Sequence, residues 1–327
     1  MTNGRPLVAL SLAGTCLLLP AGAAAQRIHP DSVMAHVDYL ASDALEGRSA
    51  GTDGYLWAAR HGAAALRAAG AGPAVAGPDA GEGGSFLQAF SVPATVTRPG
   101  AESWNVIGVV QGTDPALRDE YVLIGAHLDG QGVGRDRLGG PAGVHNSAND
   151  NATGSALVLE IARHVAAAPP ARSVVFALWG AEEVGLVGSG HFVRNPTVPL
   201  DRIRAVINLD GVGRFDRAPQ GVAEIYALGS ELVCPAFGAA LRQVNDRSGR
   251  LRFRTDDPNN WFTASDHIHF HRRGIPAVFL TDLGSDDYHR PTDDADRIDA
   301  QRLALVGETA LAFLTELAGD DPWICGG

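Results

Sequence analysis

The chain of 327 residues is long enough for one large domain or two small ones, and its hydrophobic content of 45% is ordinary for a globular protein. A formal net charge of −11 argues against nucleic acids and anionic membranes as partners. The chain contains no lysine, which excludes a Schiff-base lysine and a P-loop lysine.

The first 25 residues have the pattern of a cleavable signal peptide. Arg5 precedes an apolar stretch over residues 6–20 that is too short to span a bilayer, and Ala23-Ala24-Ala25 offers a small-residue cleavage site. Cys16 lies inside the apolar stretch after a poor lipobox, which argues against a lipid anchor. No later apolar stretch is long enough for a membrane span. We therefore expect a secreted or periplasmic protein.

Two cysteines remain after removal of this segment. Cys234 and Cys325 could form a disulfide in an oxidising compartment, although the sequence does not show whether they do. Neither has the C-x-x-C spacing of a cysteine-based zinc site.

Residues 26–85 are expected to form a helical lead-in. Asp31 and Ser32 can cap a helix whose apolar face carries Val33, Val37 and Leu40. An alanine-rich helix is expected over residues 55–69, after a glycine-containing loop.

From about residue 86, predicted strands alternate with predicted helices. The expected strands cover residues 86–92, 105–111, 121–127, 173–179, 205–209, 225–228 and 277–280, and the expected helices cover residues 152–167, 185–194, 231–244 and 300–318. Unbroken apolar strands are typical of sheets buried on both faces. The pattern predicts an α/β fold in which a mainly parallel mixed sheet carries helices on both faces, as one domain over residues 26–327.

Acidic and histidine side chains follow the ends of these strands. His127 ends one strand, Glu182 and Glu183 follow the next, and Asp210 follows a third. In such sheets, functional groups gather at the carboxyl ends of the strands. Taken alone, each residue has an ordinary explanation, such as a satisfied core histidine or a loop acid.

Glu182 and Glu183 are adjacent carboxylates at the end of a buried strand, so they repel each other unless a cation or proton lies between them. No arginine is close in sequence. Asp150 lies at a helix start and His289 in an acidic loop. Added to the residues that follow the strands, they give two histidines, three acids that could bind metal, and one further glutamate. This set suits two zinc-like ions and a general base.

Six segments carry a family resemblance: Gly125-Ala-His-Leu-Asp129, Ala148-Asn-Asp-Asn-Ala-Thr-Gly154, Ala181-Glu-Glu-Val-Gly-Leu186, Leu209-Asp210, Ser265-Asp-His267 and Tyr288-His-Arg-Pro-Thr-Asp293. In this order they resemble the M28 family of co-catalytic zinc peptidases, which includes bacterial leucyl and Streptomyces-type aminopeptidases. Residues 39–48 also resemble bacterial members. The resemblance implies a zinc-exopeptidase-like fold with two zinc ions per chain and a peptide substrate. No protease-associated insert is expected.

The resemblance also implies the metal ligands. His127 and Asp210 would bind one zinc, Glu183 and His289 the other, and Asp150 would bridge the two. A cis peptide bond would follow Asp150.

Further roles are implied for the neighbouring residues. Glu182 would be the general base that deprotonates the metal-bridging water, and Tyr288 would stabilise the oxyanion. Asp129 would orient His127, and Asp293 would orient the second histidine ligand.

Several residues depart from the family pattern or are ambiguous. Asn149 stands where many members have aspartate, so one charge near the site is missing. Asp266 lies in a segment that the family places near the substrate cleft, which predicts a substrate-binding role. His267, His269 and His271 look like a ligand tract, but on a helix their spacing does not converge.

The sequence thus predicts an exported di-zinc metallopeptidase, an aminopeptidase that removes N-terminal residues. One alternative is a glutaminyl-cyclase-like acyltransferase with a single zinc, and another is a non-catalytic receptor-like domain. The sequence does not indicate the preferred N-terminal residue, the native metal or the oligomeric state.

Overall fold

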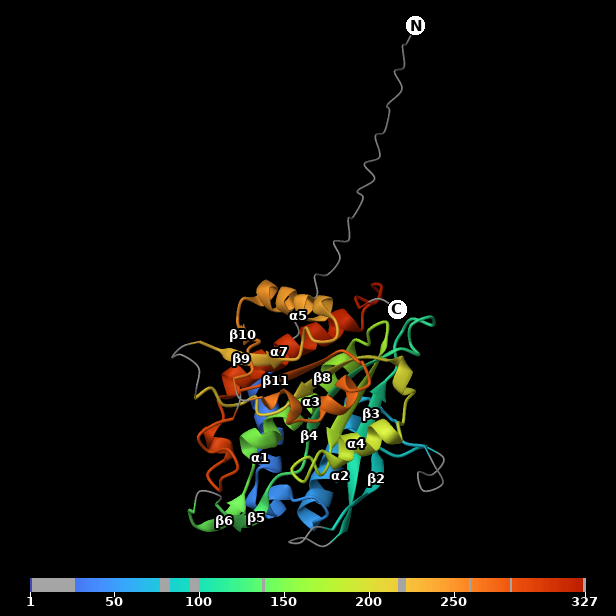
Figure 1. The fold of residues 1–327 in the computed structure, drawn as a ribbon. Helices are drawn as coiled ribbons and strands as arrows, with labels where there is room; N and C mark the ends of the chain where they lie inside the picture. The colour runs from blue at the N-terminus through green and yellow to red at the C-terminus, as the bar shows by residue number, and fades with distance from the viewer. Residues whose placement is uncertain are drawn as a thin grey trace.

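A nine-stranded sheet forms the centre of the molecule in the computed structural model, which describes residues 1, 27–76, 83–94, 100–136, 139–216, 222–258, 260–282 and 284–325. Residues 2–26, which hold nearly all of the expected signal peptide, lie outside the described residues. The four central strands are parallel neighbours in the order β7 (Ser173–Trp179), β4 (Tyr121–His127), β8 (Ile203–Leu209) and β11 (Ala277–Thr281) (Figure 1). Almost all of their side chains are buried, as expected for strands covered on both faces.

Mostly antiparallel strands extend the sheet on both sides. On one side, β3 pairs antiparallel with β7 and also carries β1 and β2; on the other, β9 pairs antiparallel with β11 and parallel with β10. Their bounds are β1 (Gly72–Pro73), β2 (Leu87–Val92), β3 (Ala101–Val110), β9 (Glu224–Leu228) and β10 (Arg252–Arg254).

Helices cover both faces of the sheet, which confirms the expected fold class. Five pack on one face: α1 (Pro30–Leu40), α2 (Asp53–Ala69), α3 (Thr153–Ala167), α5 (Pro235–Ser248) and α7 (Ala300–Leu317). On the other face, α4 (Val187–Arg194) and α6 (His267–His271) contribute Phe192 and Phe270, which pack against Trp179 of β7.

Short elements connect the larger ones. They are the hairpin of β5 (Gly132–Arg135) and β6 (Ala142–His145), and the helical turns η1 (Asp43–Arg48), η3 (Ala148–Ala152), η4 (Leu200–Arg202), η5 (Trp261–Thr263) and η6 (Ala295–Arg297). Residues 130–145 carry no sequence pattern that predicts strands, so this hairpin is a finding of the structure.

Two helices begin later than the sequence predicts, for local backbone reasons. The helix expected from residue 185 begins at Val187, because Gly185 and Leu186 have φ angles of 114° and 57° that no α-helix contains. The helix expected from residue 231 begins at Pro235, whose fixed φ suits the first helical turn.

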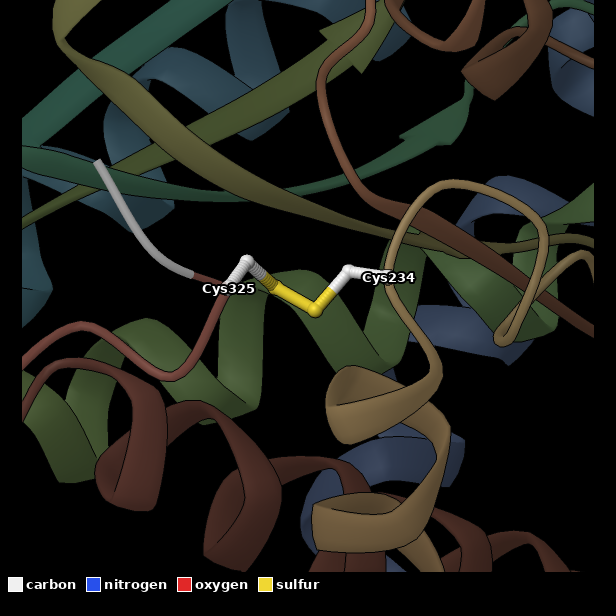
Figure 2. The surroundings of a disulfide bond; sticks show 2 residues. All are labelled: Cys234 and Cys325. Atoms are coloured by element: carbon white, nitrogen blue, oxygen red, sulfur yellow. A yellow bond between two sulfur atoms is a disulfide. The ribbon is translucent and has the colours of Figure 1, made fainter.

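A disulfide joins Cys234, just before α5, to Cys325 in the C-terminal segment, with their Cα atoms 5.6 Å apart (Figure 2). It ties the end of the chain to the start of α5, a pairing that the sequence alone left open. In the described part of the chain, no helix combines the length and apolar character that a membrane crossing needs.

Candidate metal centre

Parallel strand order brings the predicted ligands to one edge of the sheet. β4 lies between β7 and β8, so His127 at the end of β4 is flanked by the residues that follow the other two strands. Glu182 and Glu183 follow β7, and Asp210 follows β8. Residues far apart in the sequence therefore meet where these strands end.

Asp150 lies in η3, at the start of α3. The peptide bond from Asp150 to Asn151 is cis, which confirms the expectation. The Asn151 side chain accepts a hydrogen bond from the Gly154 backbone N–H at 3.0 Å, so it caps the following helix. The Asp293 carboxylate accepts the backbone N–H groups of Asn149 and Asp150 at 3.0–3.1 Å. The hydrogen bonds of Asn151 and Asp293 thus fix the backbone of the segment that carries Asp150.

Two groups of donor atoms converge on Asp150. His127 Nε2 lies 3.0 Å from Asp150 Oδ1 and 3.2 Å from Asp210 Oδ1. His289 Nε2 lies 3.0 Å from Asp150 Oδ2 and 3.1 Å from Glu183 Oε2. Within each group the donor atoms all lie within 4.8 Å of one another, and each group uses a different oxygen of Asp150.

Burial and charged neighbours shift the pKa values of these groups. Burial acts to lower the pKa of His127, but Asp210, Glu182 and Asp150 raise it well above its usual value. His289 behaves in the same way, and Asp150 and Glu183 raise its pKa to about 10. Burial and the nearby Asp150 raise the pKa of Glu183 to about 7. Such a cluster needs positive charge between its carboxylates.

The residues present fit a pair of divalent metal ions. Imidazole nitrogens and carboxylate oxygens suit zinc, and each group supplies one histidine, one acid of its own and the shared Asp150. Glu183 Oε1 is buried and has no hydrogen-bond partner among the described residues, which is costly for a carboxylate oxygen unless a cation contacts it.

Glu182 belongs to neither donor group and instead borders a cavity of about 350 Å³. Burial raises the pKa of Glu182 well above its usual range, although His127 opposes this. Tyr288 also borders the cavity, and its ring stacks on His289 with the centroids 3.8 Å apart. The remaining lining includes Asn149, Asp150, Asp210, Asn260, Trp261, Phe279 and Thr281.

Three residues predicted near the site have surroundings that the sequence did not reveal. The Asp129 carboxylate accepts the backbone N–H groups of Glu182 and Glu183, whereas the backbone oxygen of Asp129 is the nearer partner of His127 Nδ1, at 3.1 Å against 3.8 Å for Oδ1. Asp293 contacts the backbone of Asn149 and Asp150. Asp266 is fully buried and does not line the cavity; a direct contact with substrate would require the structure to open.

The histidine tract lies in α6, and none of its histidines belongs to either donor group. His267 is fully buried and packs between the rings of Phe262 and Phe279. His269 Nε2 contacts the backbone oxygen of Leu186. The tract thus has mainly packing roles in the described structure.

Asn149 takes part in a hydrogen-bond network through both ends of its side chain. Its Nδ2 donates to Asp282 Oδ2 at 3.0 Å, and its Oδ1 accepts from the Gly213 backbone N–H at 2.8 Å. An aspartate at this position would have no N–H group to donate and would face the Asp282 carboxylate. Asparagine, which departs from the family pattern, therefore suits the surroundings of residue 149 in this chain.

Sequence reasoning missed several residues that contact the predicted ligands. Ser265 Oγ donates to Asp210 Oδ2 at 2.6 Å, and Gln131 Nε2 donates to Glu183 Oε2. Arg48 is buried beside the loops that carry His127 and Asp150. Only the likeness of segments 39–48 and 265–267 to family segments could have drawn attention to Arg48 and Ser265; residues 130–145 offered no signal for Gln131.

Comparisons with known proteins identify the family of this chain. The model of peptidase family M28 matches residues 105–314. An aminopeptidase of Pseudomonas aeruginosa is 36% identical over 185 residues, which are 55% of this chain but 31% of that relative. The chain therefore spans about a third of the length of this curated relative.

Solved structures share the fold at low sequence identity. BSAP, a zinc aminopeptidase from Bacillus subtilis, aligns with a TM-score of 0.67 at 17% identity, covering 89% of this chain and 95% of that chain. A Bacteroides thetaiotaomicron glutaminyl cyclase aligns with a TM-score of 0.65 at 20% identity, covering 88% and 98%. Because the family model matches well over half of the chain, this protein belongs to peptidase family M28.

Proposed function

We propose that this protein is an exported di-zinc aminopeptidase that hydrolyses N-terminal residues from peptides. The observation that carries the proposal is the pair of donor groups sharing Asp150, with Glu182 left over beside the cavity. His127 and Asp210 would hold one ion, and Glu183 and His289 the other. With the ligands assigned in this way, the Glu182 carboxylate binds no metal and can act as a general base and acid.

When bound, zinc would polarise the scissile carbonyl group and lower the pKa of the attacking water molecule. Glu182 accepts a proton from the attacking water and passes it to the leaving nitrogen, as the bond from the carbonyl carbon to that nitrogen breaks. Burial raises the pKa of Glu182, which makes its carboxylate a stronger base. Burial also raises the pKa of Tyr288, so its phenol stays protonated and can donate to the oxyanion.

The Pseudomonas aeruginosa relative is an aminopeptidase, which supports removal of N-terminal residues rather than internal cleavage. The cavity of about 350 Å³ offers room for one end of a peptide.

Aminoacyl-p-nitroanilides and their N-acetylated forms test this proposal directly. We expect the free aminoacyl compounds to be hydrolysed and acetylation to reduce kcat/KM by at least about tenfold, since about 1.4 kcal/mol of lost transition-state binding suffices. A panel of side chains would then rank the preferred residue. Equal rates on both forms would refute recognition of the amino terminus.

A glutaminyl-cyclase-like reaction is the second candidate, because the fold also matches a glutaminyl cyclase. The alternative predicted from the sequence has one zinc per chain. Metal analysis separates the two: two ions per chain support the peptidase, and one ion with cyclisation of an N-terminal glutamine supports the cyclase.

A non-catalytic receptor-like domain is the third reading. It would require a metal-free protein whose melting temperature does not respond to zinc, because a ligand that binds only the folded state must raise that temperature. All five proposed ligands and Glu182 are present, which favours an enzyme.

Export rests on the predicted signal peptide over residues 1–25. The disulfide between Cys234 and Cys325 supports it, because disulfides persist mainly in oxidising compartments. Cleavage after Ala25 can be tested by N-terminal sequencing of protein recovered from outside the cytoplasm.

A further inference from the structure

Arg48 is a fully buried arginine whose hydrogen bonds to other described residues all run to backbone carbonyl oxygens. Its Nε donates to Leu128 at 3.0 Å, Nη1 to Asn146 at 2.8 Å and to Leu40, and Nη2 to Ser147 at 3.0 Å. Four of the five N–H groups of a guanidinium are thereby used. Such planar, multiple donation fixes the relative positions of the segments that supply the oxygens.

The segments held by Arg48 carry ligands of the proposed metal centre. Leu128 lies between the ligand His127 and Asp129, whose carboxylate accepts the backbone N–H groups of Glu182 and Glu183. Asn146 and Ser147 lead directly into the segment with the bridging residue Asp150. One guanidinium therefore joins the loop after β4 to the loop before α3.

The backbone around Arg48 is shaped for this position. Arg48 itself has a φ of 52°, in the left-handed region that few non-glycine residues occupy. Its carbonyl oxygen accepts the Gly130 backbone N–H at 3.2 Å. A Cβ atom on Gly47 would lie 2.5 Å from the His145 backbone oxygen, so only glycine allows η1 to approach the β6 strand.

The charge of Arg48 also faces the metal centre. Burial lowers its pKa to about 10, but Asp129, Asp293, Asp150 and Glu183 act in the opposite direction, so the group stays charged at neutral pH. None of its hydrogen bonds within the described residues reaches a carboxylate. A buried charge without a direct counter-ion is costly unless opposite charges lie nearby. Here the nearby negative charge is that of the carboxylate cluster itself.

We propose that Arg48 is a positioning residue of the metal centre. Its guanidinium holds the segment that follows His127 and the segment that leads to Asp150 in a fixed position relative to each other. It also provides fixed positive charge that offsets part of the carboxylate repulsion before metal binds. This inference rests on the proposed di-zinc site.

The test compares Arg48→Met with Arg172→Met. Arg172 is the control, because it is also buried and donates to the backbone oxygens of Gly319 and Asp321; unlike Arg48, it also pairs with a carboxylate, that of Glu120, at 2.8 Å. It precedes β7, at the opposite end of that strand from Glu182. Zinc content would be measured on the proteins as purified, and zinc affinity on the metal-stripped proteins by titration against a chelating dye. Thermal unfolding would be followed with and without zinc.

We expect both variants to unfold at lower temperature and only Arg48→Met to lose metal affinity. Loss of a group that supports metal ligands typically weakens binding by about 10–100-fold, so a decrease of at least about tenfold is expected. Arg48→Lys keeps the charge but not the planar fork, and should have intermediate affinity. This variant also preserves the test if Arg48→Met does not fold.

Two results would overturn the inference in distinguishable ways. Unchanged zinc affinity in Arg48→Met or Arg48→Lys, with a loss of stability like that of Arg172→Met, would show a purely structural role and leave the proposed function intact. A wild-type protein that binds no zinc would instead refute the proposed metal centre.

Discussion

Adjacent glutamates acquire different surroundings at the scale of single residues. Glu183 Oε2 lies 3.1 Å from His289 Nε2 within a donor group, whereas Glu182 borders the cavity and belongs to neither group. The Asp129 carboxylate accepts the backbone N–H groups of both, which sets the direction of each side chain. One carboxylate can therefore bind metal while its neighbour moves a proton.

The exchange Glu182→Gln tests this separation of roles. It removes the proton acceptor and keeps the size of the side chain, so we expect an unchanged zinc content and a fall in kcat of about 10²–10⁴-fold. Zinc analysis and steady-state kinetics on an aminoacyl-p-nitroanilide measure the two quantities. Glu316→Gln, in α7 and remote from the cavity, is the control. Full kcat in Glu182→Gln would contradict the assignment of the general base.

At the scale of elements, a histidine pair joins α1 to α2. His36 Nδ1 and His61 Nε2 lie 2.9 Å apart, and the ring of Tyr39 stacks on His61. Burial and the neighbouring His36 lower the pKa of His61 to about 4, and burial lowers the pKa of His36 despite Glu160. Both rings are therefore neutral in the folded protein at neutral pH.

The pair should make the stability of this contact depend on pH. The pKa of His61 in the folded protein lies below the unfolded value of 6.5. The stabilisation from its neutral ring is therefore complete above pH 6.5 and is lost as the pH falls toward 4. We expect His61→Gln, which does not titrate, to lose less melting temperature than wild type between pH 7 and pH 5. Thermal unfolding across this range measures the difference. Parallel curves for the two proteins would show that His61 does not titrate in this way.

At the scale of the whole molecule, two contacts attach the C-terminal segment to the rest of the domain. The disulfide ties Cys325 to Cys234 at the start of α5 (Figure 2). Arg172, which directly precedes β7, donates to the backbone oxygens of Gly319 and Asp321. Neither fastening touches the cavity of the proposed site.

The double variant Cys234→Ser with Cys325→Ser should lower global stability without changing the site. The cysteines are 91 residues apart, and closing a loop of this length restricts the unfolded chain by up to about 4–5 kcal/mol. Denaturant unfolding in the presence of saturating zinc would measure the loss. Zinc affinity and kcat should match wild type; a change in either would mean that the disulfide also shapes the metal centre.

How much of this protein can be predicted from its sequence depends on how far apart along the chain the contacting residues lie. Apolar runs such as 173–179 identify strands because burial on both faces demands them. The residues that follow these strands, including Glu182, Glu183 and Asp210, then meet at one edge of a parallel sheet by topology alone. The fold class and the main candidate residues therefore follow from the sequence.

Only the tertiary structure decided which groups support these residues. Arg48 reaches carbonyl oxygens 80–99 residues away, and Asp293 holds the backbone of Asn149, 144 residues distant. Asp266 is buried rather than lining the cavity, although its sequence segment resembles one near a substrate cleft. Such contacts depend on the packing of several elements together, and no local pattern of apolar and polar residues records them.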